Sequence, residues 1–216
     1  MKFRLMFFAI FFLAFRSPAF GQETENWFID RVAMRNAATQ HYFQVYQQRG
    51  SWLGPDVIHV DFGRSNYGEI FFGGGKVLYK GKHFDLTHED YFGQTSGSAS
   101  QGARYILPWT KVDYKLTDKI SGNAVYFFYA PLNQAAKFHQ AIERAKMEYD
   151  FGRFKIGVGY AGSKASGKDW QNKPLLTTTV KCGKFGSLEF WLQRLPGNHA
   201  QAQIRYSGFF KTGKHN

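Results

Sequence analysis

The strongest candidate for acid–base chemistry in this sequence is the run His88-Glu89-Asp90. A histidine beside two carboxylates can act as a general base or bind a cation, although three adjacent polar residues beside a loop are more often simply solvated. The run Gly73–Gly75 lacks the strand-turn-helix context of a phosphate-binding loop. In a strand, these glycines instead predict a bend or the close packing of an inward-facing ring.

The sequence does not predict a metal site. His139 and His199 lie in expected loops, with no partner at metal-ligand spacing. Cys182 is the only cysteine, which excludes a disulfide framework and a cysteine-based zinc site. We therefore expect no metal and no cofactor.

Strands must position these side chains, and the C-terminal run Ser187–Phe210 shows the strand pattern most clearly. Apolar residues alternate there with Glu, Trp, Gln, Arg and Ser on both sides of the turn Pro196–Asn198. A period of two places successive side chains on opposite faces of a strand. This hairpin therefore has one dry and one wet face, which is typical of both soluble sandwiches and membrane barrels.

From Asp56 onward the sequence predicts about ten strands, with boundaries uncertain by ~2–4 residues. The expected strands are Val57–Phe62, Glu69–Tyr79, His83–Phe92, Arg104–Leu116, Asn123–Ala130, Ala141–Asp150, Phe154–Ala161, Leu175–Cys182, Ser187–Arg194 and Gln201–Phe210. Several reach the ~9–11 residues that a tilted membrane strand needs. A chain with 19% aromatic residues and 23 glycines also fits an all-β protein rich in turns.

The N-terminus has the features of a secretory signal peptide. Lys2 and Arg4 precede an apolar run, Leu5–Phe15, and Ala19–Gly21 forms a small-x-small cleavage site. The apolar run is shorter than the ~20 residues of a spanning helix. We therefore expect residues 1–21 to be removed on export.

Residues 22–50 are predicted to be a helical lead-in to a barrel that occupies residues 51–216. Glu23–Arg49 is the one plausible helical region, although Tyr42–Tyr46 could equally be extended. An amphipathic helix on the membrane surface and a short packing helix both fit this sequence.

The links between the expected strands alternate between short and long. Short joins occur at 80–82, 117–122, 151–153 and 183–186, and long polar ones at 93–103, 131–140 and 162–174. Bacterial outer-membrane barrels combine short periplasmic turns with longer outer loops. The sequence therefore favours a closed antiparallel up-and-down transmembrane β-barrel of about 10 strands, within a range of 8–12.

In such a barrel the charged face of each strand would line the lumen. The charged residues expected there are Asp61, Asp113, Arg144, Lys146, Glu148, Glu189 and Arg205. Their charges could pair with one another, while the apolar face meets lipid and closure removes any unpaired sheet edge. Side chains fill eight-strand barrels, so we expect a mostly plugged lumen in one only slightly wider.

The basic residues indicate a possible partner. The chain has a formal net charge of +12 and remains basic after signal removal. The lysines expected in the outer loops are Lys137, Lys164, Lys168 and Lys173. Lipopolysaccharide phosphates would attract these ammonium groups, although lysines in loops can equally be solvated without a ligand. Export argues against nucleic acid as the polyanion.

The order of signal, lead-in and alternating strands, ending in aromatics at Tyr206, Phe209 and Phe210, resembles small bacterial outer-membrane β-barrel proteins. This resemblance implies insertion by the barrel insertion machinery. The segments Phe154–Tyr160, Asp169-Trp170, Pro174-Leu175 and Leu195–Gly197 are locally similar to lipid A palmitoyltransferases. That family uses a His with an Asp-Ser pair. His59 could supply the first, but the sequence contains no Asp-Ser dipeptide.

Three functions follow from these patterns. The first is an integral outer-membrane barrel with a structural, adhesive or lipid-interacting role. The second is a barrel enzyme that modifies lipid A or phospholipid, with His59, His88, Glu89 and Asp90 as catalytic candidates. The third is a soluble periplasmic lipocalin-like carrier, which requires an apolar inner face and a polar outer one.

Overall fold

The computed structural model describes residues 24–35, 38–62, 67–97, 102–195, 197 and 199–212. Within these ranges most residues lie in strands, and the one helical element is the 3-10 turn η2 (Gly183–Phe185). No helix in this part of the chain is long and apolar enough to cross a membrane. The predicted signal peptide at residues 1–21 lies outside the described residues.

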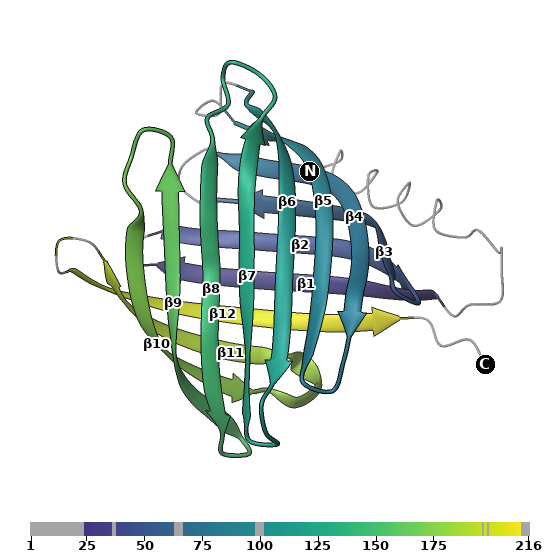
Figure 1. Ribbon diagram of the computed structural model, residues 1–216, viewed down its shortest axis with the longest axis vertical. Helices are drawn as coiled ribbons and strands as arrows, with labels where there is room; N and C mark the ends of the chain where they lie inside the picture. Colours follow the sequence, from purple (N-terminus) through teal and green to yellow (C-terminus); the bar gives the residue numbers. More distant parts are fainter. Residues whose placement is uncertain are drawn as a thin grey trace.

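The strands form one closed antiparallel barrel of twelve (Figure 1). They are β1 (Thr24–Arg35), β2 (Ala38–Arg49), β3 (Trp52–Asp61), β4 (Gly68–Lys80), β5 (Phe84–Ser96), β6 (Arg104–Lys115), β7 (Ile120–Pro131), β8 (His139–Asp150), β9 (Phe154–Ala165), β10 (Gln171–Lys181), β11 (Ser187–Leu195) and β12 (His199–Thr212). Every strand pairs with its neighbours in sequence, and β1 pairs with β12 to complete the ring.

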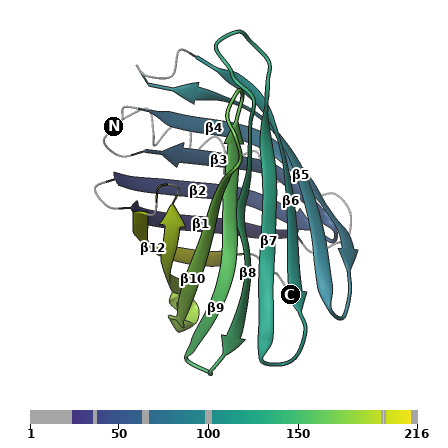
Figure 2. The same ribbon diagram turned by 60° about the vertical axis from the view of Figure 1, so that its left-hand side comes forward.

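The barrel has two unlike ends. The start of β1, the end of β12 and the links β2–β3, β4–β5, β6–β7, β8–β9 and β10–β11 lie at one end, called here the turn end. The links β1–β2, β3–β4, β5–β6, β7–β8, β9–β10 and β11–β12 lie at the loop end. Figure 2 shows the hairpin β8–β9 turning at the lower, turn end and β7–β8 reaching the upper, loop end. The short joins predicted at 80–82, 117–122, 151–153 and 183–186 lie at the turn end, and the three predicted long ones lie at the loop end. The brief join predicted at 63–68 and the turn predicted at 196–198 are exceptions, because the links β3–β4 and β11–β12 also lie at the loop end.

Two features of the structure differ from the predicted architecture. The barrel has twelve strands, which is the upper limit of the predicted range of 8–12 and more than the ten expected, and Glu23–Arg49 is not helical, because its described part forms the hairpin β1–β2. The physical reason is closure, since without β1 the backbone of β12 would have an unpaired edge. Trp27 and Tyr46 stack across this hairpin, with ring centroids 6.2 Å apart. Such cross-strand aromatic pairs stabilise a sheet.

Side chains alternate between the lumen and the outer surface along each strand. On β9, Ile156 is 49% exposed and Val158 is 57% exposed, while glycines occupy the intervening inward positions. On β12, Gln203 and Arg205 are buried in the lumen, and Ile204 between them is exposed. The two faces of the C-terminal hairpin therefore have the predicted polarity, with charge inside and apolar side chains outside.

The glycines of β4 allow two side chains of β5 to lie across the inner face of the wall. A Cβ at Gly73 would lie 2.8 Å from Cδ1 of Tyr91, and one at Gly75 would lie 2.7 Å from Cγ of Glu89. Both separations are shorter than van der Waals contact. The close packing of an inward ring predicted for Gly73–Gly75 is confirmed at Gly73.

Replacement of Gly73 by alanine tests this packing. We expect Gly73→Ala to lower the free energy of unfolding by about 1–3 kcal/mol, because the new methyl group overlaps the Tyr91 ring and the β5 backbone. The measurement is guanidinium unfolding of the folded barrel in detergent micelles. Gly68→Ala on the same strand is the matched control, because its Cβ comes no closer than 3.0 Å, to the flexible hydroxyl of Ser96. Equal destabilisation of both variants would contradict this account.

Candidate functional site

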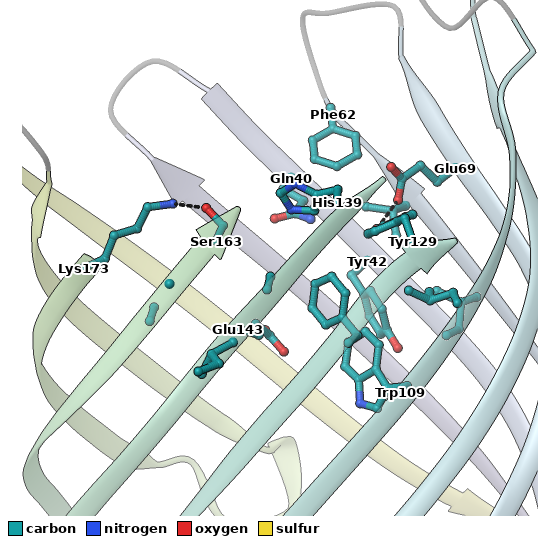
Figure 3. A pocket seen from close by; sticks show the side chains of 18 of the residues that line it. Gln40, Tyr42, Phe62, Glu69, Trp109, Tyr129, His139, Glu143, Ser163 and Lys173 are labelled. Atoms are coloured by element: carbon teal, nitrogen blue, oxygen red, sulfur yellow. Dashed lines mark hydrogen bonds between the residues drawn. The ribbon is translucent and has the colours of Figure 1, made fainter. Parts of the chain in front are cut away.

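The lumen contains a cavity of about 530 Å³ toward the loop end. The side chains that line it differ in size, since β4, β6 and β7 contribute bulky rings, whereas β8 and β9 contribute Ala141, Ala161 and Gly162. Figure 3 shows the cavity between the Glu69–Tyr129 hydrogen bond and the Lys173–Ser163 hydrogen bond. The small residues on β8 and β9 leave the space that the rings do not fill.

One wall of the cavity is aromatic. We call the rings of Phe71, Tyr105, Trp109, Phe127 and Tyr129 the aromatic wall. Trp109 and Phe127 stack at 4.8 Å between centroids, and Tyr129 packs edge-on against Phe127 at 5.7 Å and Tyr105 at 5.2 Å. Such ring contacts fix the geometry of the wall, which presents flat apolar faces and phenol hydroxyls to the cavity.

A buried carboxylate lies at the loop end of the aromatic wall. The Glu69 carboxylate accepts hydrogen bonds from the hydroxyls of Tyr67, at 2.9 Å, and Tyr129, at 3.0 Å. Burial and the nearby Glu69 charge raise the pKa of Tyr67, which precedes β4, above its usual value. Tyr67 therefore remains a neutral donor to Glu69.

Six charged side chains lie on the opposite wall and continue from the cavity toward the turn end. We call Glu143, Arg144, Lys146, Glu148, Glu189 and Arg205 the ion-pair cluster. The Lys146 ammonium lies 3.1 Å from Glu148 Oε2 and 3.3 Å from Glu189 Oε1, and its side chain is 3% exposed. Glu148 also accepts hydrogen bonds from the hydroxyls of Thr177, at 2.9 Å, and Thr179, at 2.7 Å. Lys146 is therefore the shared cation of two carboxylates.

The rest of the ion-pair cluster is organised by Glu143. Its Oε1 lies 2.5 Å from Arg205 Nη2, and its Oε2 lies 2.9 Å from Arg144 Nη1. The Arg205 guanidinium also lies 4.2 Å from the centroid of the Trp191 ring. Arg144 donates from Nε to Asn123 Oδ1 at 2.7 Å. Glu143 was not among the predicted lumen charges, although two of its partners were.

A second buried polar group lies on the wall formed by β2, β3 and β5. We call Gln44, Asp56, Glu89 and Tyr91 the carboxylate cluster. The Tyr91 hydroxyl donates to Asp56 Oδ2 at 2.7 Å and contacts the carboxylate of Glu89. Gln44 Nε2 donates to the same Asp56 oxygen at 2.6 Å. Sequence reasoning missed Asp56 because it lies immediately before the expected strand Val57–Phe62, although in the structure it is part of β3.

The two sides of β3 are the reverse of those predicted. Ile58, Val60 and Phe62 line the cavity, so His59 and Asp61 lie on the outer face. Asp61 is therefore not a lumen charge, and His59 does not reach the lumen. The other expected acidic partner, Asp113, lies 2.7 Å from Lys111 of its own strand. The reversal occurs because the lumen is apolar at this point, against the aromatic wall.

The run His88-Glu89-Asp90 does not form one site. Glu89 points into the lumen, as part of the carboxylate cluster, while His88 and Asp90 lie on the outer face, 3.5 Å apart. The barrel wall separates them because adjacent residues of a strand face opposite ways. The catalytic candidates His59, His88, Glu89 and Asp90 are therefore not assembled.

Of the four lysines predicted to lie in outer loops, three are exposed and one lines the cavity. Lys137 and Lys168 are exposed in the links β7–β8 and β9–β10, and Lys164 is exposed near the end of β9. Lys173 is instead part of β10 and lines the cavity, where its ammonium donates to Ser163 Oγ at 3.1 Å. His139, expected in a loop, begins β8 and also lines the cavity. The side chain of His199 lies outside the described residues.

The lumen presents rings and paired charges to the cavity. Among the residues that the structure describes, no three His, Cys, Asp or Glu side chains are placed to hold a metal ion. The cavity presents the aromatic wall on one side, and Lys173, Glu143 and Arg205 on the other. Flat rings stack on apolar faces of a solute, and the charged groups bind its polar edges.

No family model matches this sequence, and no curated protein matches it. Solved structures of porins share its fold. The KdgM porin has a TM-score of 0.55 and 14% identity, covering 88% of this chain and 99% of the porin. The NanC porin has a TM-score of 0.54 and 9% identity, covering 87% of this chain and 100% of the porin. These likenesses show that the chain has a β-barrel fold like that of these porins, and neither is a likeness to a lipid A palmitoyltransferase.

The ion-pair cluster generates a prediction about Lys146, whose ammonium group lies 3.3 Å from Glu189 Oε1. We expect Lys146→Met to cost about 3–5 kcal/mol of unfolding free energy, because the buried Glu148 and the partly buried Glu189 both lose the ammonium group that they share. Adding Glu189→Gln should recover part of the loss, as measured by guanidinium unfolding in micelles. Lys155→Met, which removes a lysine bonded to Ser121 Oγ, should cost less. Additive effects of Lys146→Met and Glu189→Gln would contradict the pairing.

Proposed function

We propose that this protein is an integral outer-membrane barrel that lets small hydrophilic solutes pass through a narrow lumen. The observation that carries the proposal is the inversion of polarity across the barrel wall on β8 to β12. Buried charges line the lumen there, and exposed Met147, Ile156, Leu176, Leu192 and Ile204 cover the outside. Lipid is the solvent in which an apolar exterior around a polar interior is stable.

The strand dimensions support membrane insertion. The strands contain 9 to 14 residues, and a tilted membrane strand needs about 9–11. All twelve strands are paired on both edges, so the ring presents no open edge to hydrocarbon. The fold that this chain shares with outer-membrane porins agrees with this environment.

The difference between the turn end and the loop end supports an orientation of the barrel in the outer membrane. Outer-membrane barrels place their short turns in the periplasm and their longer loops outside. The turn end would then face the periplasm, and the cavity would open toward the outside. Lys137 and Lys168, exposed in links at the loop end, remain candidates for contact with lipopolysaccharide phosphates.

The ion-pair cluster is evidence that the route through the lumen is narrow. It lies on the turn-end side of the cavity, where Lys146, Glu148 and Glu189 project from β8 and β11 into the lumen. A solute entering from the loop end would meet the aromatic wall first and then this cluster. One solved KdgM porin is a complex with disordered oligogalacturonate. For this chain we propose small polar solutes that combine a ring face with charged or hydroxyl edges.

The two other functions considered from the sequence are less well supported. An enzyme needs a reactive pair, and His59, His88 and Asp90 lie on the outer face, away from the lumen. A lipocalin-like carrier needs a polar exterior, whereas Phe72, Phe92, Ile106, Ile156, Val158 and Leu176 are exposed on the outside.

Arginine on the outer face tests membrane insertion. We expect Ile156→Arg to cost about 2–4 kcal/mol if the residue lies near mid-bilayer, because the charge must enter hydrocarbon. The measurement is urea-dependent folding into phospholipid vesicles. Phe151→Arg, in the β8–β9 turn, is the control and should cost about 0–1 kcal/mol at the interface. Equal effects of the two substitutions would place Ile156 outside the membrane.

Single-channel recording in planar bilayers tests solute passage. We expect the wild type to conduct weakly. The double variant Glu143→Ala/Arg205→Ala should raise conductance about twofold, because it removes two charged side chains that line the cavity, while Arg144 loses its carboxylate partner but keeps its hydrogen bond to Asn123 Oδ1. Arg194→Ala, on the outer face of β11, is the control and should leave conductance unchanged. A folded, heat-modifiable barrel in which neither wild type nor double variant conducts would exclude the proposed passage.

A further inference from the structure

A groove crosses the outer surface of the barrel at β3 to β5, close to the turn end. Its floor is the backbone of Gly73, Gly74 and Gly75, and its rim includes Trp52, Lys76, Leu78, His88 and Asp90. Gly74 faces outward, and a Cβ there would lie 2.6 Å from the carbonyl oxygen of Leu53. Because the floor has no side chains, the outer wall is hollowed at this point.

The rim of the groove carries opposite charges. The Lys76 ammonium lies 5.0 Å from the centroid of the Trp52 ring, and no described carboxylate lies within ion-pair distance of it. On the next strand Asp90 is exposed, 3.5 Å from Nε2 of His88. Nδ1 of His88 lies 2.9 Å from Thr110 Oγ1, which holds the imidazole in place. The groove therefore offers a cation and an anion from two neighbouring strands.

An apolar surface continues from the groove toward the loop end. Phe72 of β4, Phe92 of β5 and Ile106 of β6 lie side by side in register. These side chains are 45%, 55% and 40% exposed. Trp52 follows the β2–β3 turn directly and is 63% exposed, as expected for a ring at a membrane interface. Lys76 pairs with Trp52 beside the β2–β3 turn, while the exposed apolar side chains of β4 and β5 lie on both sides of the groove, Phe72 and Phe92 toward the loop end and Leu78 and Phe84 toward the β4–β5 turn.

We infer that this groove binds one phospholipid with a zwitterionic ethanolamine head group. The phosphate is matched by the Lys76 ammonium beside the Trp52 ring, and the ligand ammonium is matched by the Asp90 carboxylate, to which it donates charge-assisted hydrogen bonds. The acyl chains lie over Phe72 and Phe92. The inference rests on the membrane insertion proposed above.

The charge pair also distinguishes head groups. Phosphatidylglycerol offers the phosphate but no cation for Asp90. Phosphatidylcholine offers a cation without N–H donors, so it cannot hydrogen-bond to the carboxylate. Both lack one of the two polar interactions available to phosphatidylethanolamine.

Native mass spectrometry of the full-length mature chain in detergent, titrated separately with these three phospholipids, measures the binding. We expect the wild type to bind phosphatidylethanolamine roughly three- to tenfold more tightly than the other two. Lys76→Gln should weaken all three, and Asp90→Asn should remove only the preference for ethanolamine. Lys119→Gln is the matched control, since its ammonium also lies over an aromatic ring at the turn end, 5.8 Å from the centroid of Tyr149, and Lys119 does not line this groove.

Three results would overturn the inference: equal binding of the three lipids to the wild type, unchanged binding by Lys76→Gln, or an equal loss in Lys119→Gln. Tighter binding of phosphatidylglycerol than of phosphatidylethanolamine would also overturn it, since that would indicate a general anion site. Heat-modifiable migration is recorded for every sample. A folded barrel without lipid selectivity rejects the groove alone, whereas a chain that never inserts into membranes rejects the proposed function as well.

Discussion

The pairing of β1 with β12 is the interaction on which the rest of this structure depends. It joins Asn26–Arg35 to the segment from Gln203 to Thr212 and leaves no strand in the ring with a free edge. In hydrocarbon an unpaired backbone N–H or C=O group costs several kcal/mol, because no water can replace the missing partner. Only a closed ring has a separate outer surface for the apolar side chains and a lumen for the polar ones.

Closure at twelve strands also determines what the lumen must contain. Side chains can fill an eight-strand barrel, but a ring of twelve encloses more space than they occupy. On β8 and β9, small residues such as Ala141 and Ala161 leave part of that space open. Toward the turn end, charged groups project into it, and their burial is tolerable only because Lys146, Arg144 and Arg205 each have a carboxylate partner.

Strand alternation predicted the barrel class and the faces of the C-terminal hairpin, because there the charged and apolar residues are cleanly separated. Arg205 lies in the lumen, and Ile204 and Ile156 are outside, as the period of two implied. The pattern failed on β3. Alternation identifies two faces but not which is inner, and the partly aromatic lumen made Ile58 and Val60 resemble lipid-facing residues.

The other errors have similar causes. Trp27, Phe28 and Ile29 are consecutive apolar residues, so β1 shows no alternation there, and only its pairing with β2 and β12 requires a strand. Contacts between distant strands, such as Tyr91 with Asp56, are invisible to any local pattern. The lumen position of Lys173 was missed because the length of β10 was underestimated, and strand ends depend on pairing with neighbours.

The position of β1 has a consequence for the order of assembly. Its second partner is the last strand of the chain, so the first strand to emerge during export waits for the whole sequence before both its edges are satisfied. Neither half of the chain can complete a ring alone. The barrel therefore cannot close until β12 has been added. Any chain that ends before β12 keeps one unpaired edge on β1, and that edge can pair with another chain.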